Sequence, residues 1–335
     1  MILAELGERR ILREIIPRYV DGAGDDCADL GSIGGSAVVT TDPVPSPAAG
    51  LIGGDPDLFW MGWLLVTINA SDLAAAGARP HSFVAALDLP GDLDVCDFER
   101  MLAGIKASCA ANGLRYVGGN LREASKIAAV GTAIGSVTSQ PLRRTGAQPG
   151  QIAVLVGNGG QFWADAERAM AGVQLDKITS PLFSPVSQAP NIYQLHEAGL
   201  LTCAMDTSDG LAPTLTELAL VNDLAIDVDL VKIRSASTFT DVQERAERLW
   251  MGWGDWAVVA AIEKSSLERF AQTAQQHRIP YTAIGEFAEG QSVRLVDGHR
   301  SIPMGRLESE RFAEDSWFTI GIQEYVRRLR AFSLP

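Results

Sequence analysis

The chain has 335 residues, of which 47% are hydrophobic and 21% are charged, so its composition is globular and its length suits two ordinary domains. Its net charge of −13 argues against a nucleic-acid partner, because phosphate backbones are held by basic surfaces. No apolar run approaches the roughly 20 residues that span a bilayer, and the first residues lack a signal core, so we expect a cytoplasmic protein with no membrane partner. Its cysteines and histidines are scattered, so neither a disulfide framework nor a zinc site is indicated.

The first half of the chain predicts alternating helices and strands. The clearest element is a helix over 57–76, which lacks proline, is rich in Leu and Ala, and is stopped by Gly77 and Pro80. The other predicted elements are a helix over 5–16 stopped by Pro17, a strand over 37–41, a loop over 43–56, strands over 82–87, 115–118 and 128–137, and a helix over 95–112. This alternation indicates an α/β or α+β domain.

Turn residues accumulate over 144–150 (RTGAQPG), directly before a new strand at 152–156. We therefore expect a first domain over 1–148 and a second over 149–335. In the second domain the pattern predicts a helix over 163–170, a loop over 180–190, a strand over 202–205 and a helix over 211–222. Both domains are expected to be mixed in secondary structure.

Aspartates concentrate at the ends of predicted elements and in turns. They are Asp25 and Asp26 (GAGDDCA), Asp42 (TTDP), Asp72 (NASDLAAAGA) and Asp209 (MDTSDG). Hard divalent cations prefer oxygen ligands, and magnesium usually bridges one or two carboxylates to substrate phosphates. The pattern therefore favours several magnesium ions holding a nucleoside triphosphate.

Each aspartate also has a structural interpretation. Asp25 and Asp26 lie among glycines and Asp42 precedes Pro43, so all three suit turns. Asp72 differs, because aspartate is a poor residue inside an apolar helix, and Asn69 lies three residues earlier on the same face. A functional role is favoured there over a solvated helix face.

Asp209 follows an apolar strand and opens an amphipathic helix, so Ser208 or Asp209 could simply be the N-cap. A helix N-terminus beside Gly210 also lets backbone amides and a carboxylate-bound metal approach a phosphate together. The glycines of VGNGG at 156–160 suggest a tight turn or a phosphate contact. No GxxxxGK[ST] loop and no kinase HRD or DFG set is present, so common nucleotide-binding folds are not supported.

Seven stretches occur in the order typical of one family: GAGDDCADL, VTTD, TINASDLAAAGARP, GGN, RRTGAQPGQIAVLVG, MDTSDGLAPTLTELA and IPYTAIGEF. In these stretches the chain resembles the thiamine-monophosphate kinase family, within the superfamily of aminoimidazole ribonucleotide synthetase and selenophosphate synthetase. The resemblance implies an α+β fold of two mixed α/β domains of the aminoimidazole ribonucleotide synthetase-like type. It also implies a homodimer whose N-terminal sheets form a barrel, with ATP and Mg²⁺ in a cleft between domains.

The resemblance implies roles for individual residues. The metal-binding carboxylates would be Asp25 or Asp26 together with Asp42, Asp72 and Asp209, of which Asp72 and Asp209 are also expected to be catalytic. Further cofactor-binding candidates are Thr40, Thr41, Asn69, Gly118, Gly119, Asn120 and Ser208. Asn120 stands where the family's GGDT motif has an acid, and an amide brings no negative charge to balance Mg²⁺.

The acceptor side departs further from the family pattern. The family's GGED-tyrosine stretch is GWGDWA here, which makes Trp253, Asp255 and Trp256 candidates for substrate binding or for core packing. The family's His-Phe pair after TTD and its C-terminal aromatic motif are not recognisable. We therefore expect ATP- and Mg²⁺-dependent phosphoryl transfer to a small molecule other than thiamine monophosphate. A genuine thiamine-monophosphate kinase and a non-catalytic ATP-binding dimer are the alternatives.

Overall fold

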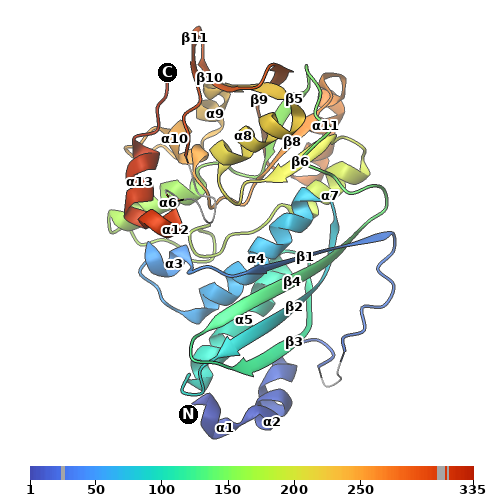
Figure 1. Cartoon of the computed structure of the whole chain (residues 1–335), viewed down its shortest axis with the longest axis vertical. Coiled ribbons are helices and arrows are strands. Elements are labelled where there is room, and N and C mark those ends of the chain that lie inside the picture. The colour runs from blue at the N-terminus through green and yellow to red at the C-terminus, as the bar shows by residue number, and fades with distance from the viewer. Residues whose placement is uncertain (24–26, 308–313, 315–316) are drawn as a thin grey trace. The chain divides into compact units, whose positions relative to one another are not determined.

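The computed structural model describes residues 1–23, 27–307, 314 and 317–335. The chain divides into two compact units, drawn in Figure 1. The first unit consists of residues 1–73, 78–141 and 183–190, and the second of residues 74–77, 142–182 and 191–335. Each unit contains one β-sheet with helices, which confirms the predicted mixed class.

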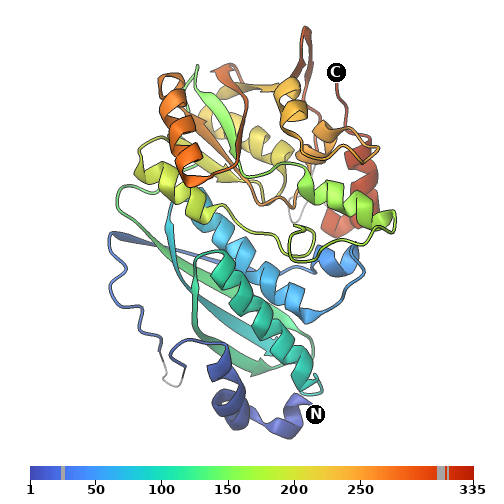
Figure 2. The ribbon, with the colours of Figure 1, turned by 180° about the vertical axis from the view of Figure 1, so that it is seen from behind.

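The first unit is a four-stranded sheet in the order β1-β4-β2-β3. The strands are β1 (Ser36–Pro43), β2 (Arg79–Leu89), β3 (Arg115–Glu123) and β4 (Ala128–Val137). β4 is antiparallel to both neighbours, whereas β2 and β3 are parallel and joined through the helix α5 (Val95–Ala111). Figure 2 shows α5 and α4 (Leu58–Ala75) lying on one face of this sheet. On the opposite face Val39 is 69% exposed and Val130 is 41% exposed.

Helices α4 and α5 pack closely because each has a glycine at the contact. A Cβ on Gly62 would lie 2.1 Å from the Met101 carbonyl oxygen, and one on Gly104 would lie 2.0 Å from that of Phe59. By length and composition alone, α4 is apolar enough to cross a membrane. Within the protein 61% of this helix is buried, as in the core helix of a soluble protein.

The predicted N-terminal helix is broken into short pieces. They are α1 (Leu3–Leu6), α2 (Glu8–Arg10), the π-helical turn η1 (Ile11–Ile15) and the 3-10 turn η2 (Ile16–Arg18). Gly7 separates the first two with φ of +78°, a backbone conformation that ends a helix. The predicted loop over 43–56 contains the short helix α3 (Ala48–Leu51).

Residues 183–190 return from the second unit to the first and pack against α4 and α5. The Pro185 carbonyl accepts hydrogen bonds from the Thr67 hydroxyl at 2.8 Å and from the Trp63 indole at 2.7 Å. The Ser187 amide donates to the buried Asn112 side chain at 2.9 Å. This segment therefore provides hydrogen-bonding partners for polar groups at the two core helices that are buried away from water.

The second unit has a seven-stranded sheet in the order β11-β10-β7-β9-β5-β8-β6. Its strands are β5 (Ile152–Val156), β6 (Cys203–Asp206), β7 (Leu224–Asp229), β8 (Val258–Ile262), β9 (Tyr281–Glu289), β10 (Val293–Asp297) and β11 (Arg300–Pro303). Its helices are α6 (Gln161–Met170), α7 (Ala189–Glu197), α8 (Leu211–Asn222), α9 (Leu230–Ala236), α10 (Ala246–Met251), α11 (Leu267–His277), α12 (Trp317–Ile320) and α13 (Ile322–Arg330), with the 3-10 turn η3 (Lys264–Ser266). Every residue of β5 and β8 is buried, so these strands form the centre of the core.

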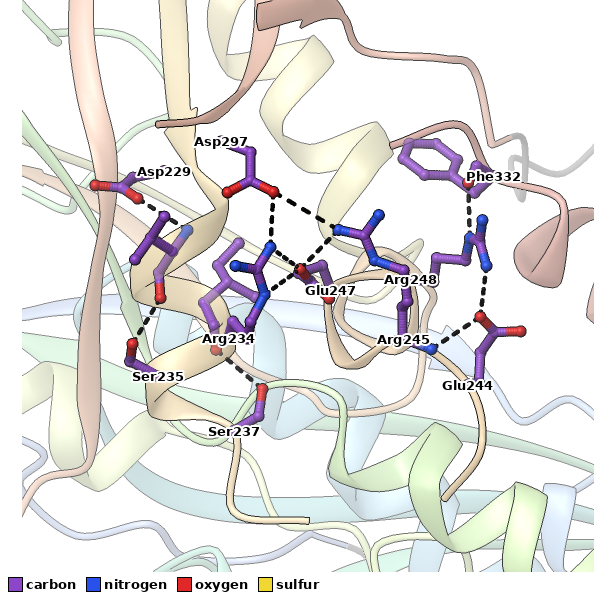
Figure 3. A network of polar contacts seen from close by, with 12 residues as sticks. Asp229, Arg234, Ser235, Ser237, Glu244, Arg245, Glu247, Arg248, Asp297 and Phe332 are labelled. Carbon is purple, nitrogen blue, oxygen red and sulfur yellow. Dashed lines mark hydrogen bonds and ion pairs between the residues drawn. The ribbon is translucent and has the colours of Figure 1, made fainter. Parts of the chain in front are cut away.

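An ion-pair network joins α9, α10 and β10 (Figure 3). Glu247 is 2% exposed and accepts hydrogen bonds from Arg234 at 2.7 Å and from Arg245 at 2.9 Å. Arg234 also contacts Asp297 at 2.8 Å. Burial disfavours the charged form of Glu247, but the two guanidinium groups and a backbone hydrogen bond hold its pKa below the ordinary value. The network is charge-satisfied and holds three elements of the unit together.

Candidate functional site

A polar cluster joins β1 to α4 in the first unit. The Thr40 hydroxyl donates a short hydrogen bond to the Asp72 carboxylate. The Asp42 amide donates to the Asn69 side-chain oxygen at 3.0 Å, and the Asn69 amide group donates to the Leu65 carbonyl at 2.8 Å. Asn69 is fully buried, whereas Asp42 and Asp72 are half-buried. The sequence prediction that Asn69 and Asp72 share one helix face is confirmed, and β1 brings Thr40 and Asp42 to that face.

The close approach of β4 to this cluster depends on Gly131. A Cβ at this position would lie 2.5 Å from the Asn69 side-chain nitrogen and 2.6 Å from the Phe83 ring. Gly131 also pairs with Asp42 across the sheet, and its carbonyl accepts the Thr41 hydroxyl at 2.8 Å. Any side chain at 131 would therefore push the Asn69 amide away from the end of β1.

The glycines of the GGN stretch lie on the edge strand β3. A Cβ on Gly119 would lie 1.9 Å from the Ala85 carbonyl oxygen, so only glycine allows β3 to approach β2 here. Gly118, Gly119 and Asn120 line a cavity of about 290 Å³ together with Ala23 and Cys27. Asp25 and Asp26 lie outside the described residues, but the residues on either side of the 24–26 segment thus line the same cavity as the GGN stretch.

The sheet places the predicted cofactor-binding residues on two faces. Residues that pair across the sheet form rows. One row contains Asn120, Ala86, Val130 and Pro43. The adjacent row contains Asp42, Gly131, Ala85 and Gly119. Because neighbouring rows project to opposite faces, Asp42 and Thr40 face α4, while Thr41 and the exposed Asn120 face away from it.

In the second unit, Ser208 and Asp209 lie in the turn between β6 and α8. The Ser208 hydroxyl donates to the Asp206 carboxylate at 3.3 Å. The N-cap residue of α8 is Gly210, with φ of +108° and no capping side chain, so the N-cap interpretation of Ser208 and Asp209 is wrong. Asp209 is half-buried and lies two residues before Leu211, the first residue of this helix.

The loop 252–257, which contains the GWGDWA stretch, packs against that turn. A Cβ on Gly210 would lie 2.9 Å from the Gly252 carbonyl carbon and 3.0 Å from the Trp253 nitrogen. The Asp255 carboxylate accepts the amides of Gly160 at 2.6 Å and Phe162 at 2.8 Å, at the start of α6. Burial nevertheless raises the pKa of Asp255 to about 7, against the effect of these two amides. Asp255 therefore caps α6 and joins the 157–160 glycine turn to this loop.

The donor set of the first unit suits a hard divalent cation. Asp42 and Asp72 offer carboxylate oxygens; the Thr40 hydroxyl donates to the Asp72 carboxylate, and the Asn69 side-chain oxygen accepts the Asp42 backbone amide. Within the described ranges, no three His, Cys, Asp or Glu side chains are close enough to form a metal site by themselves. Magnesium commonly uses one or two carboxylates plus phosphate oxygens, so this arrangement fits a metal bound together with a nucleotide.

Two residues of these sites were missed from the sequence. The Thr207 hydroxyl receives the Ala257 amide at 3.1 Å, and the Thr207 amide donates to the Ala257 carbonyl at 2.9 Å, which joins the two loops. Gly131 makes room for Asn69. The only sequence signals were a threonine before the SDG turn and a glycine in a strand, which is a weak indication of close backbone approach.

Comparisons with known proteins agree with this architecture. Residues 24–137 match the family model described as "AIR synthase related protein, N-terminal domain". The thiamine-monophosphate kinase of Methanospirillum hungatei is 29% identical over 82% of this chain and 90% of that protein. The enzyme of the same name from Halobacterium salinarum is 28% identical over 92% of this chain and 99% of that protein.

The fold is also found among solved structures. The hydrogenase maturation protein HypE in complex with ATP superposes with a TM-score of 0.72, covering 92% of this chain and 98% of that chain at 18% identity. That likeness establishes the fold, which is the expected aminoimidazole ribonucleotide synthetase-like type. The chain is thus similar over most of its length to thiamine-monophosphate kinases, and residues 24–137 match the AIR synthase related N-terminal domain.

Proposed function

We propose that this protein is an ATP- and Mg²⁺-dependent enzyme that transfers the γ-phosphoryl group to a small-molecule acceptor. The observation that carries the proposal is the pair of half-buried aspartates, Asp42 and Asp72, which β1 and α4 bring to one face, where the Thr40 hydroxyl donates to Asp72 and the Asn69 side chain holds the Asp42 backbone. The relatives that match 82% and 92% of this chain are named thiamine-monophosphate kinases, and this supports the same reaction class.

The protein's own residues bind and orient the reactants. Asp42 and Asp72 of the first unit are the proposed metal ligands there, with Asp25 or Asp26 as a further ligand, and Asp209 is the proposed metal ligand of the second unit. Magnesium, when bound, neutralises charge that develops on the transferring phosphoryl group. Asn69 and Thr40 keep the carboxylates in place by holding the end of β1 against α4. Such transfer needs no protein nucleophile, because positioning and charge neutralisation supply the catalysis.

The acceptor is proposed to differ from thiamine monophosphate, or thiamine monophosphate is bound through contacts that differ from those of the family. The loop after Asp42, the GWGDWA stretch and Asn120 all depart from the family pattern. A buried polar group left unpaired costs about 1 to 3 kcal/mol, so a few lost contacts would lower turnover by orders of magnitude. A genuine thiamine-monophosphate kinase and a non-catalytic ATP-binding protein are the alternatives that kinetics would separate.

The decisive experiment is steady-state phosphorylation of thiamine monophosphate beside a panel of phosphates, amides and carbonyl compounds. We expect Mg²⁺-dependent ATP binding and slow turnover of thiamine monophosphate. Turnover on the order of 1 per second or faster would make the protein an ordinary thiamine-monophosphate kinase. ATP binding without turnover on any acceptor would instead favour the non-catalytic alternative.

We also propose a cytoplasmic homodimer built on the first unit. The sheet face opposite α4 carries Val39 and Val130, which are apolar and exposed, and β1 and β3 are open edges. Light scattering is expected to give twice the protomer mass of 35.8 kDa, and Val39→Lys is expected to shift the protein toward monomer. A wild-type protein that stays monomeric at micromolar concentration would contradict this proposal.

A further inference from the structure

A second cavity in the first unit, of about 440 Å³, lies between the N-terminal helical pieces and the ends of β2 and β3. Leu3 and Ile11 line it from the N-terminal side, and Leu89 and Phe98 line it from β2 and α5. None of these four side chains is more than 7% exposed, so the interior walls are apolar. A cavity of this volume and lining is typical of sites that hold small organic molecules.

Backbone hydrogen bonds hold the two walls of this cavity together. The Leu3 amide donates to the Leu93 carbonyl at 2.9 Å, and the Ala4 amide donates to the Gly91 carbonyl at 2.8 Å. Gly7, between α1 and α2, also lines the cavity, and a Cβ there would have no atom within 4 Å. The bend at Gly7 therefore leaves open space beside walls that are already fixed. A preformed cavity of this kind loses little conformational entropy when a ligand binds.

The charged side chains that line the cavity are Glu8, Arg122 and Glu123. Arg122 is already paired, because its Nε donates to the Asp88 carboxylate at 2.9 Å and its terminal nitrogen donates to the second oxygen. Within the described ranges, the side chains of Glu8 and Glu123 form no ion pair or hydrogen bond. The charge of Arg122 is balanced by Asp88, so the two glutamates give this apolar cavity an excess of negative charge.

Gly91 allows the Glu123 carboxylate to lie beside the N-terminal wall. A Cβ on Gly91 would lie 3.0 Å from Glu123 Oε1 and 3.5 Å from the Ala4 Cβ. The carboxylate therefore lies over the 90–93 turn and close to α1, instead of extending away from the protein. Its charge is held at the edge of the apolar walls, where a bound molecule can reach both.

We propose that this cavity binds a small organic cation, whose apolar ring system fills the interior while its ammonium group is held by Glu8 and Glu123. Burial of the ring supplies most of the affinity, and the two carboxylates select a cation over a neutral or anionic molecule of the same shape. An anion is repelled by the same pair. Among the described residues, none that is proposed to bind ATP or Mg²⁺ lines this cavity, so the inference is separate from the proposed function.

The first test is titration calorimetry with tryptamine, tryptophol and indole-3-acetate, which share an indole ring and carry a positive charge, no charge and a negative charge. We expect saturable binding of tryptamine, about fivefold tighter than that of tryptophol, and the weakest binding for indole-3-acetate. The preference for tryptamine should disappear when Glu8→Gln and Glu123→Gln are combined. Asp97→Asn, at an exposed acid outside the cavity, is the matched control and should keep it. No binding of tryptamine, or equal affinity for tryptamine and tryptophol in the wild type, overturns the proposal.

The second test places the ligand by filling the cavity. Ala4 lines the cavity and is exposed, so Ala4→Phe adds a ring to the space without displacing a buried side chain. We expect an unfolding temperature close to that of the wild type, and binding of both tryptamine and tryptophol weakened on the order of tenfold. Ala110→Phe, at an exposed position of α5 outside the cavity, is the control and should bind both probes normally. Wild-type affinity of Ala4→Phe for tryptamine would place the ligand elsewhere and overturn the inference.

Discussion

The candidate-site aspartates of the first unit and several buried or bridged acids of the second are held in different ways. In the first unit, Asp72 accepts a hydrogen bond from the Thr40 hydroxyl, and the backbone beside Asp42 is held by the Asn69 amide. In the second unit, Glu247 is clasped by two arginines, and Arg168 bridges the carboxylates of Asp165 and Asp241. A hydroxyl that donates to a carboxylate orients it without adding an opposite charge. Arginine partners neutralise the charge of a carboxylate, and the resulting ion pairs stabilise the fold.

The comparison explains why counting acids is a poor guide to a metal site. The chain carries 41 acidic residues, but an ion-paired carboxylate adds little attraction for Mg²⁺. Asp255 shows a third use, because its two oxygens accept backbone amides at the start of α6. A sequence motif locates an acid near a substrate, while its partners decide whether the oxygens are available.

The largest effect is expected when charge is removed from the proposed metal ligands. Asp72→Asn and Asp209→Asn are each expected to weaken Mg²⁺-dependent ATP binding on the order of 100-fold, or about 2.8 kcal/mol. The unfolding free energy should change by less than about 1 kcal/mol, because the side-chain volume is kept. Titration calorimetry measures the first quantity and denaturant unfolding the second. The exposed Asp92→Asn serves as the control, and unchanged ATP affinity in both active-site variants would refute the metal-cluster interpretation.

The reverse result is expected at the arginine-paired acid. Glu247→Gln removes the charge between Arg234 and Arg245, and breaking a buried pair costs about 3–5 kcal/mol. Both arginines are partly exposed and partly recover hydration, so we expect about 2 kcal/mol of destabilisation with ATP affinity unchanged. The matched control is Glu217→Gln, whose pair with Arg144 is exposed and long at 4.0 Å. Equal effects of the two variants on stability would contradict the structural role proposed for the buried Glu247 pair.

Local pattern predicted most of the secondary structure. The strands 128–137 and 152–156 and the helix 211–222 have the bounds expected from hydrophobic periodicity and turn residues. The strand order was not predictable, because β1 pairs with β4 across about ninety residues of chain. The return of residues 183–190 to the first unit depends on buried groups such as Thr67, which give no local signal.

The candidate site was predictable only in part. Spacing placed Asn69 and Asp72 on one helix face, and the structure adds Thr40 and Asp42 to it. The capping of α6 by Asp255 could not be foreseen, because its partners lie 93 and 95 residues earlier in the chain. The roles of these residues as metal ligands stay predictions until binding is measured.

The smallest expected effect is a pH dependence that separates Asp255 from the arginine-paired acids. Burial raises the pKa of Asp255 to about 7, against roughly 3.9 in an unfolded chain. Between these values the folded protein keeps a proton that the unfolded chain releases, so the contribution of Asp255 to stability falls as pH rises. Measured from pH 6 to 7.5, the unfolding free energy of the wild type minus that of Asp255→Asn should decrease by about 1.3 kcal/mol. Asp241→Asn is the control: Arg168 lowers the pKa of Asp241, so its contribution is complete above pH 5 and the difference should stay constant. A wild-type-minus-Asp255→Asn difference that stays constant over this range would mean that the two amides outweigh burial and keep Asp255 ionised.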